Sequence, residues 1–330
     1  MTEPVLSIKD LVVEFPFRND VFRAVSGVSF DIMPGEVVGV VGESGAGKSM
    51  TGSAVIGLIE PPGHIASGEI RLKGERIDNL PEEAKAKLRG RRIGMVFQDP
   101  LTSLNPLYTI GEQLIETIRT HLPLNEAEAR QKAIDLLTEA GIPKAAERME
   151  SYPHQFSGGM RQRVMIAIAL ACDPEVLIAD EPTTALDVTI QAQILELMKE
   201  LREKLGMAVI WITHDLGVIA GIADRVMVMY GGQVVEQAPV RELFGNPQHP
   251  YTRALLKTVP SVSGEREEKL AVIEGQPPIL SAAPAACPFR ARCPQAFERC
   301  ERENPARVPV GPAHDAACFG DPATGGPRDV

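Results

Sequence analysis

The stretch GESGAGKS at residues 42–49 follows the apolar run 37–41 and precedes a segment of helical composition at 51–58. Its pattern, G-x-x-x-x-G-K-S/T between a strand and a helix, predicts a phosphate-binding loop. Glycines let the backbone turn so that several N–H groups point into one concavity, and the following helix directs its positive end there. Lys48 would add a charge on the β- and γ-phosphates, and the Ser49 hydroxyl would reach Mg²⁺. The alternative is an accidental glycine-rich turn, which the strand and helix on either side argue against.

Composition limits the classes of function. The chain has 330 residues, a formal net charge of −10 and enough apolar residues for a full core plus a smaller second unit. Acidity argues against a nucleic-acid binder, which usually carries a basic face. The longest apolar run, 164–172, is too short to span a bilayer, and the first residues do not resemble a secretory signal. We therefore expect a cytoplasmic chain whose membrane role, if any, comes through a partner.

Buried strands alternate with helices along much of the chain. Continuous apolar runs of strand length are typical of parallel strands covered on both faces. They predict an α/β fold with a mostly parallel sheet, beside an antiparallel β layer built from looser alternation. The expected parallel strands are 37–41, 93–97, 176–179, 208–212 and 225–230, and the antiparallel layer is 5–14, 28–32 and 68–72.

Helical periodicity dominates the middle of the chain, and proline dominates its end. Helices are expected over 126–140, after Ser157, and where Ile190, Ile194, Leu197 and Leu201 recur at helical spacing. After about residue 237, prolines are scattered among glycine and alanine, so this tail cannot hold a core by apolar burial alone. The residues 323–327 are expected to be disordered.

Polar side chains follow several of the expected parallel strands. Functional loops lie at the carboxyl ends of such strands, so one crevice is expected to collect Gly42, Gln98, Asp180 and His214. Asp180 is expected to bind Mg²⁺, and Glu181, pointing the other way, to polarise the attacking water. His214 would bond the γ-phosphate, and Gln98 would sense Mg²⁺ or the water.

A second glycine turn, FSGGMRQ at 156–162, opens a helix and repeats the anion-binding device of the first. Two phosphate cradles in one chain suggest that each serves a different nucleotide in a face-to-face dimer. A plain helix cap by Ser157 is the alternative, and it holds geometrically in either case.

Four of the five cysteines lie after position 286, at 287, 293, 300 and 318. Disulfides are improbable in a cytoplasmic chain. Zinc sites usually contain a close C-x₂₋₄-C pair, which is absent here, whereas iron–sulfur clusters tolerate varied spacing. Metal of some kind would supply folding energy that the proline-rich segment lacks. Cys172, on a helix, is expected in the core.

The ordered set of motifs resembles the ATP-binding subunits of ABC transporters. The matching pieces are GESGAGKS, VFQDP, FSGGMRQR, VLIADEP, TALD and ITHD, which cover roughly residues 5–236. The resemblance implies a P-loop NTPase (RecA-like) core with an antiparallel β subdomain, a helical signature subdomain at about 99–165, and a small cysteine-rich C-terminal extension. The corresponding domains are an ATP-binding cassette at 1–236 and an extension at 237–330.

By resemblance, the chain binds ATP and Mg²⁺ and hydrolyses ATP. The signature turn 157–160 would contact the ATP held by a partner's loop, Asp187 would cross the dimer interface, and 99–110 would face a membrane permease. Met160 departs from the usual glutamine of the signature. Phe15 is the best match for the aromatic that stacks on adenine, with Phe17 and Phe22 as rivals. The expected ATP contacts are Gly42, Ser44, Gly45, Ala46, Gly47, Lys48, Ser49, Met50 and Phe15; those of the signature are Ser157, Gly158, Gly159 and Met160; those to Mg²⁺ are Ser49, Gln98 and Asp180; and the catalytic residues are Glu181, His214 and Gln98.

Within that superfamily the chain looks like an ATPase subunit of dipeptide and oligopeptide importers, on the stretches QDPLTSLNP, YPHQFSGGM, DEPTTALDVTIQAQI and HPYTRALL. Relatives import nickel or other small solutes, so the cargo is set only by class. The implied partners are a second ATPase subunit, expected to be a paralogue, two transmembrane permease subunits and an extracytoplasmic solute-binding protein, at the cytoplasmic face of the inner membrane.

Peptide-importer ATPases that resemble this chain carry a four-cysteine tail that holds a [4Fe–4S] cluster. The resemblance therefore favours such a cluster on Cys287, Cys293, Cys300 and Cys318, with zinc as the alternative. A different class of function, a soluble ABC-type ATPase acting on DNA or the ribosome, is the competing hypothesis. Such proteins tend to carry two cassettes or long coiled-coil inserts, and this chain has a single cassette and an acidic balance.

Overall fold

The computed structural model describes residues 3–18, 20–184, 186–258, 272–322, 324 and 326–328. The chain divides into two compact units, which we describe separately. The unit that we name the helical unit comprises Met1–Leu6, Ile32–Glu36 and Asn79–Ile212, and the unit that we name the phosphate-loop unit comprises Ser7–Asp31, Val37–Asp78 and Thr213–Val330.

Three short parallel strands form the centre of the helical unit. They are β6 (Ile93–Val96), β7 (Val176–Asp180) and β8 (Ala208–Ile212). Strand β7 pairs with β6 on one side and with β8 on the other, both in parallel register. Every residue of β7 and β8 is buried, as expected for parallel strands covered on both faces.

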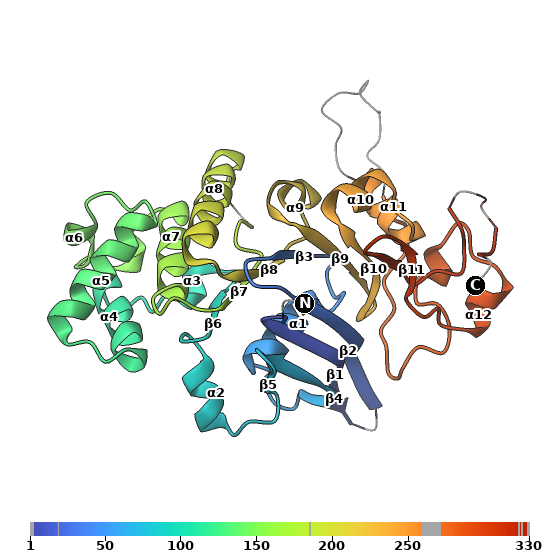
Figure 1. Cartoon of the computed structure of the whole chain (residues 1–330), viewed down its shortest axis with the longest axis horizontal. Helices are drawn as coiled ribbons and strands as arrows, with labels where there is room; N and C mark the ends of the chain where they lie inside the picture. The colour runs from blue at the N-terminus through green and yellow to red at the C-terminus, as the bar shows by residue number, and fades with distance from the viewer. Residues whose placement is uncertain are drawn as a thin grey trace. The chain divides into compact units, whose positions relative to one another are not determined.

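Helices α4 (Ile110–His121), α5 (Glu126–Glu139), α6 (Ala145–Arg148) and α7 (Gly158–Ala169) lie together in the helical unit, in green in Figure 1. Capping boxes begin α4 at Thr109 and α5 at Asn125, since each side chain bonds the third helical amide and a glutamate there bonds back. The unit also contains α2 (Glu82–Leu88), α3 (Pro100–Ser103), the 3₁₀ turn η1 (Pro153–Gln155) and α8 (Val188–Leu205).

The phosphate-loop unit is built around strand β3 (Val37–Val41), which is buried throughout. It pairs in parallel with β9 (Arg225–Tyr230), and β9 turns at two glycines into the antiparallel strand β10 (Gln233–Pro239). Strand β12 (His314–Ala316) pairs with β10, and β11 (Val308–Gly311) pairs with β12. The end of the chain therefore extends the same sheet that carries the phosphate loop.

The helices of this unit are short. They are α1 (Lys48–Ile56), α9 (Leu216–Ile222), α10 (Val240–Gly245), α11 (Pro250–Lys257), the 3₁₀ turn η2 (Arg290–Arg292) and α12 (Glu298–Arg302). Tyr251 of α11 and Phe289 are fully buried, so the proline-rich tail contributes large aromatic side chains to the core of the unit.

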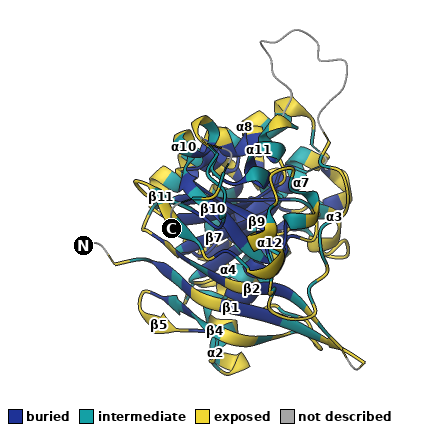
Figure 2. Ribbon diagram, turned by 90° about the vertical axis from the view of Figure 1, so that its right-hand side faces the viewer, coloured by how far each residue is buried: buried dark blue, intermediate teal, exposed yellow. Residues whose placement is uncertain are grey.

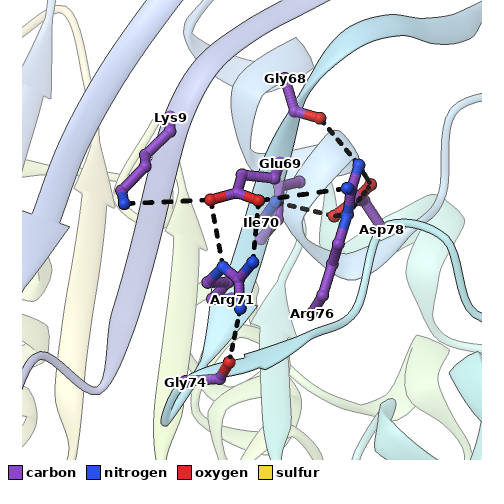
Figure 3. Close-up of polar contacts among 8 residues, drawn as sticks. All are labelled: Lys9, Gly68, Glu69, Ile70, Arg71, Gly74, Arg76 and Asp78. Carbon is purple, nitrogen blue, oxygen red and sulfur yellow. Dashed lines mark hydrogen bonds and ion pairs between the residues drawn. The ribbon is translucent and has the colours of Figure 1, made fainter.

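A second sheet has the strand order β2-β1-β4-β5, formed by β2 (Asp20–Ile32), β1 (Leu6–Phe17), β4 (His64–Leu72) and β5 (Glu75–Arg76). Its outer surface carries an ionic network centred on Glu69, which accepts two hydrogen bonds from Arg71 and lies near Lys9 (Figure 3). Next to it, Arg76 donates to Asp78. Exposed pairs of this kind contribute little to stability, so the network mainly keeps this surface charged.

The predicted strands and helices are confirmed with shifted ends. Strand β2 runs from Asp20, eight residues before the predicted start, because the partly exposed residues 20–23 continue the pairing. The helix after Ser157 ends at Ala169. In Figure 2 strand β9 is dark blue with burial, whereas helix α2 shows exposed yellow. Disorder was predicted for residues 323–327, of which 323 and 325 lie outside the described residues. Gly326 and Pro327 instead make contacts: the carbonyl oxygen of Gly326 accepts from the amide of Asp321, and Pro327 forms a β-bridge with Gly320.

Candidate functional site: a phosphate loop and two strand ends

The phosphate loop lies between β3 and α1, as its pattern predicts. Gly42 and Gly47 have positive φ angles of 151° and 97°. A Cβ at Gly42 would lie 2.2 Å from the carbonyl oxygen of Met229, and one at Gly47 would lie 2.6 Å from that of Ala24. Both positions therefore require glycine for conformation and for space.

The charged side chain of the loop is buried and points back over the loop. Lys48 is 6% exposed, and its Nζ donates to the carbonyl oxygens of Gly42 at 2.8 Å and Glu43 at 3.0 Å. Helix α1 begins at Lys48, and none of the described side chains caps it. Its first amides and the ammonium group are thus suited to an anion such as a phosphate.

At the end of β7, the Glu181 carboxylate is held by two side chains. Gln98 donates from Nε2 to Glu181 Oε2 at 3.0 Å, and Thr184 donates from Oγ1 to the same oxygen at 2.9 Å. Gln98 follows β6 and Glu181 follows β7, so the neighbouring strand ends bring together two residues that the sequence predicted to act at one site. These contacts fix the direction of the carboxylate.

Asp180 is the last residue of β7 and is 7% exposed. Glu181 lies beyond the strand, at a φ of 46°, and its amide donates to Ile212. We predicted that the two carboxylates point apart because side chains alternate along a strand. This reason is wrong, because Glu181 lies outside β7. Glu181 has a left-handed backbone instead, and a strained backbone is common at functional positions.

His214 follows β8 and belongs to the phosphate-loop unit. The amide of the preceding residue, Thr213, donates to the carbonyl oxygen of Val40 in β3, the strand that leads into the phosphate loop. Asp215 caps helix α9 by accepting from the amides of Gly217 and Val218. His214 is therefore an exposed side chain on a turn fixed from both sides. Whether Gly42 and His214 gather with Gln98 and Asp180, which lie in the other unit, stays a prediction.

The second glycine turn opens α7 as predicted. The Ser157 hydroxyl accepts a long hydrogen bond of 3.4 Å from the amide of Met160. Ser157 and Gly158 are exposed, and a Cβ at Gly159 would lie 2.7 Å from Ile190 of helix α8. The helix cap by Ser157 is confirmed, and anion binding by this turn stays a prediction.

The remaining predicted residues have simple surroundings. Asp187 caps α8 by accepting from the amide of Ile190 at 2.9 Å, and it is exposed. Phe15 is half-buried, and its ring lies 6.3 Å from that of Phe22. The roles of Asp187 at an interface and of Phe15 on adenine stay predictions. The expected loop contacts Ser44, Gly45, Ser49 and Met50 are exposed or half-buried, and Ala46 is buried.

The four cysteines of the tail line one cavity with His249, Phe289 and Phe319. Burial raises the pKa of the Cys287 thiol to about 11 and also raises the pKa values of Cys293 and Cys318. Among the described residues, which include these four, no group of three or more His, Cys, Asp or Glu side chains is placed to hold a metal ion. Cys172 is fully buried, as predicted, but it lies in the turn after α7 and not on the helix, which ends at Ala169.

Four contributors were missed by the sequence analysis. Thr184 appeared only within a quoted motif, although a hydroxyl three residues after a candidate base is a recognisable signal. Glu43, Tyr251 and Arg292 form a contact across more than 200 residues, and no local pattern marks it.

These features define a class of protein: a P-loop ATPase, with a glycine loop for phosphates after β3 and an oriented carboxylate after β7. No helix in the described part of the chain combines the length and apolar character needed to cross a membrane.

Comparisons with known proteins narrow the class. Residues 25–184 match the family model described as ABC transporter, and residues 235–300 match that of the oligopeptide/dipeptide transporter C-terminal region. The chain is 47% identical to the dipeptide transport ATP-binding protein DppD of Escherichia coli, over 95% of this chain and 96% of that one. It is 48% identical to the oligopeptide transport ATP-binding protein OppD of Salmonella typhimurium, over 96% and 93%.

Comparison with solved structures gives the same class of protein. The ATP-binding cassette MJ0796, in a dimeric post-hydrolysis state bound to ADP and Pi, superposes with a TM-score of 0.65 at 29% identity, covering 72% of this chain and 99% of that one. CbiO1 of Clostridium perfringens, part of the ABC transporter complex cbiONQ, gives 0.64 at 30% identity, over 74% and 92%.

The chain belongs to the family of ABC transporter ATP-binding proteins, in its dipeptide and oligopeptide branch. The predicted fold class, a P-loop NTPase core within an α/β cassette, is confirmed. The chain is an ABC-type ATPase, and binding of ATP with Mg²⁺ is general to that family.

Proposed function

We propose that this chain hydrolyses ATP to drive the import of dipeptides, oligopeptides or a related small solute through a membrane permease. The near-complete alignment with dipeptide and oligopeptide transport ATP-binding proteins supports the class of cargo. The single observation that carries the chemistry is the Glu181 carboxylate, which Gln98 and Thr184 hold in one direction.

In the proposed mechanism, Glu181 accepts a proton from a water molecule while the water oxygen attacks the γ-phosphorus of ATP, and ADP leaves in line. Lys48, buried over the loop carbonyls, turns to the β- and γ-phosphates and neutralises the charge that builds on them. His214 bonds the γ-phosphate, and Phe15 stacks on adenine. Asp180, Ser49 and Gln98 have the oxygen donors that Mg²⁺ prefers.

Two such ATPases, of which the second is a paralogue, would clamp two nucleotides between them. The exposure of the signature turn supports this arrangement, because Ser157 and Gly158 present a hydroxyl and amides that this chain leaves largely uncovered. Asp187 would cross the interface from the start of α8.

The partners in the membrane would be two permease subunits, served by an extracytoplasmic solute-binding protein, with this chain peripheral at the cytoplasmic face. An open groove on the helical unit supports permease docking, since Ser103, Asn105 and Tyr108 line it. Leu101, Leu107 and Tyr108, close together in the sequence, are 65%, 80% and 52% exposed, and a group of exposed apolar side chains is typical of a surface that a partner covers.

We also propose that the chain comprises a cassette at 1–236, whose helical subdomain spans about 99–165, and an extension at 237–330 whose four tail cysteines hold a [4Fe–4S] cluster. The lining of one cavity by all four cysteines supports the cluster, because iron–sulfur clusters are held by cysteine thiolates. Raised thiol pKa values mean that loading must displace protons. The cluster would supply folding energy to the extension.

The variant Glu181→Gln tests the chemistry in the assembled transporter. Gln keeps the shape and hydrogen bonding but cannot take a proton, so ATP should bind normally while kcat falls about 1,000-fold and the ATPase dimer stays closed. Kd for Mg·ATP, phosphate release and peptide uptake into vesicles are measured together. Normal turnover in this variant would refute the role of Glu181 as the base. Strong ATPase activity of the transporter that is not stimulated by a peptide-loaded binding protein would refute the proposed role in import.

A further inference from the structure

Residues of the C-terminal extension hold the first variable residue of the phosphate loop, Glu43. Arg292 binds its carboxylate with two hydrogen bonds, Nη1 to Oε2 at 2.6 Å and Nη2 to Oε1 at 2.9 Å. The backbone amide of Glu43 donates to the hydroxyl of Tyr251 at 2.8 Å. The side chain and the main chain of one loop residue are thus fixed by two distant parts of the extension, both within the phosphate-loop unit.

The arginine is buried and its donors are fully engaged. Its side chain is 5% exposed, against 27% for that of Glu43. Beyond Glu43, it donates to the hydroxyl of Tyr230 and to the carbonyl oxygens of Ile273 and Glu274. Hydrogen bonding to Glu43 raises the pKa of Arg292 further above its ordinary value. A bidentate pair in such surroundings is rigid, and the loss of one partner leaves a buried charge unpaired.

Three aromatic rings form the base of this contact. Tyr230 lies 4.6 Å from Tyr251 and 5.2 Å from Phe289, centre to centre, and Tyr251 lies 5.4 Å from Phe289. All three are almost fully buried. The Tyr251 hydroxyl therefore has little freedom to leave the Glu43 amide.

The same contact joins the loop to the cysteine cavity. Phe289 lines that cavity, and Cys293, another lining residue, directly follows Arg292. The segment that supplies two of the four cysteines therefore also supplies the residue that grips Glu43.

We propose that the extension positions the phosphate loop for ATP, with Arg292 and Tyr251 as positioning residues that act through Glu43. This inference rests on the proposed function, because it assumes that the loop binds ATP. Neither residue contacts a nucleotide in the proposal. They restrict the loop to the conformation in which its amides and Lys48 face one anion, so their loss should weaken ATP binding and leave the chemical step largely intact.

The test uses the purified full-length chain and titration with Mg·ATP. Arg292→Gln should raise the Kd of the chain about tenfold and, in the assembled transporter, raise KM with little change in kcat. Tyr251→Phe should raise the Kd by less, because only one hydrogen bond is lost. Arg292→Lys, which keeps the charge and loses the bidentate geometry, should lie between wild type and Arg292→Gln.

The control variant is Arg71→Gln. Arg71 also makes two hydrogen bonds to a glutamate, Glu69, in the same unit (Figure 3), but its side chain is 39% exposed, against 5% for that of Arg292. Its Kd should match that of wild type within about twofold. Circular dichroism and thermal unfolding show whether each variant is folded. Hydrogen exchange of the amides at 42–49 reports on the loop even where binding is lost, and it should be faster in folded Arg292→Gln than in wild type.

A double variant decides whether Glu43 carries the effect. If it does, Glu43→Gln with Arg292→Gln should bind about as weakly as either single variant, because both remove one contact. Additive effects, or an Arg292→Gln protein that matches Arg71→Gln in Kd and in loop exchange, overturn the proposal while the ATPase assignment stands. A wild-type chain that does not bind Mg·ATP overturns the proposed function itself.

Discussion

The two glycine turns of this molecule use the same device in opposite surroundings. The phosphate loop at 42–49 also exposes a serine and a glycine, Ser44 and Gly45, but it is supported by its own chain: Lys48 is buried, and Glu43 is held by Tyr251 and Arg292. The signature turn at 157–160 has an exposed serine, an exposed glycine and a cap bond of 3.4 Å. One turn is finished within a single chain, whereas the other offers donors for which this chain supplies little else.

The contrast assigns different dependencies to the two turns. The phosphate loop should bind nucleotide in the isolated chain, because its conformation is fixed by contacts within the chain and does not depend on a partner subunit. An open turn can act only when another subunit brings an anion to it. Substitutions in the two turns should therefore separate binding by the single chain from hydrolysis by the assembly.

The largest effect is expected from Lys48→Ala. The ammonium group is the only full positive charge contributed by the loop sequence at 42–49, and hydrogen bonds to charged groups are the stronger kind. Affinity for Mg·ATP in the isolated chain should fall about 100-fold. Calorimetric titration measures it, with Lys87→Ala in helix α2 as the control. Wild-type affinity in Lys48→Ala would contradict the comparison of the two turns, because the phosphate loop would then not be the ATP-binding site.

A smaller and different effect is expected from Ser157→Ala. The hydroxyl caps α7 only weakly, so the isolated chain should fold and bind Mg·ATP as wild type does. In the assembled transporter kcat should fall about tenfold, since one hydrogen bond to the partner's nucleotide is lost. Titration of the isolated chain with Mg·ATP and ATPase assays of the complex measure the two halves of this prediction. An equal loss of affinity in the isolated chain would mean that the turn serves its own nucleotide.

The sequence predicted the turns well and their surroundings poorly. Apolar runs of strand length gave β3, β7, β8 and β9, because buried parallel strands have a composition that few other elements share. The loop residues were predicted because spacing and glycine content are local properties. The signature's exposure could not be predicted, since it depends on what the rest of the chain leaves uncovered.

Contacts over long sequence distances were beyond prediction for the same physical reason. Glu43 and Arg292 are 249 positions apart, and any of the chain's arginines has the chemistry to pair with a glutamate. The left-handed backbone at Glu181, with a φ of 46°, was also missed, because it follows from packing and not from residue preference. The Gln98–Glu181 contact was anticipated only as a shared strand edge.

The last prediction concerns the support of the finished loop at low pH. His249 begins helix α11, its Nδ1 accepts from the amide of Tyr251, and burial, with Arg328 nearby, lowers its pKa to about 3. In the unfolded chain histidine titrates near 6.5, so below that pH the unfolded state takes up a proton that the folded state refuses. The stabilisation by neutral His249 is complete above about pH 6.5 and is lost as the pH falls toward 3.

Between pH 6.5 and 5 this residue should lower the free energy of unfolding by about 2 kcal/mol. His249→Asn keeps a side chain that caps helices and does not titrate, so urea unfolding of this variant should depend less on pH by that amount. Burial also lowers the pKa of His121, which leaves a residual dependence of the same sign in both proteins. The exposed His154 makes His154→Asn the matched control, with wild-type behaviour expected. Identical pH profiles for His249→Asn and wild type would show that His249 is protonated in the folded chain, and Tyr251 would then lack the rigid helix start from which it reaches Glu43.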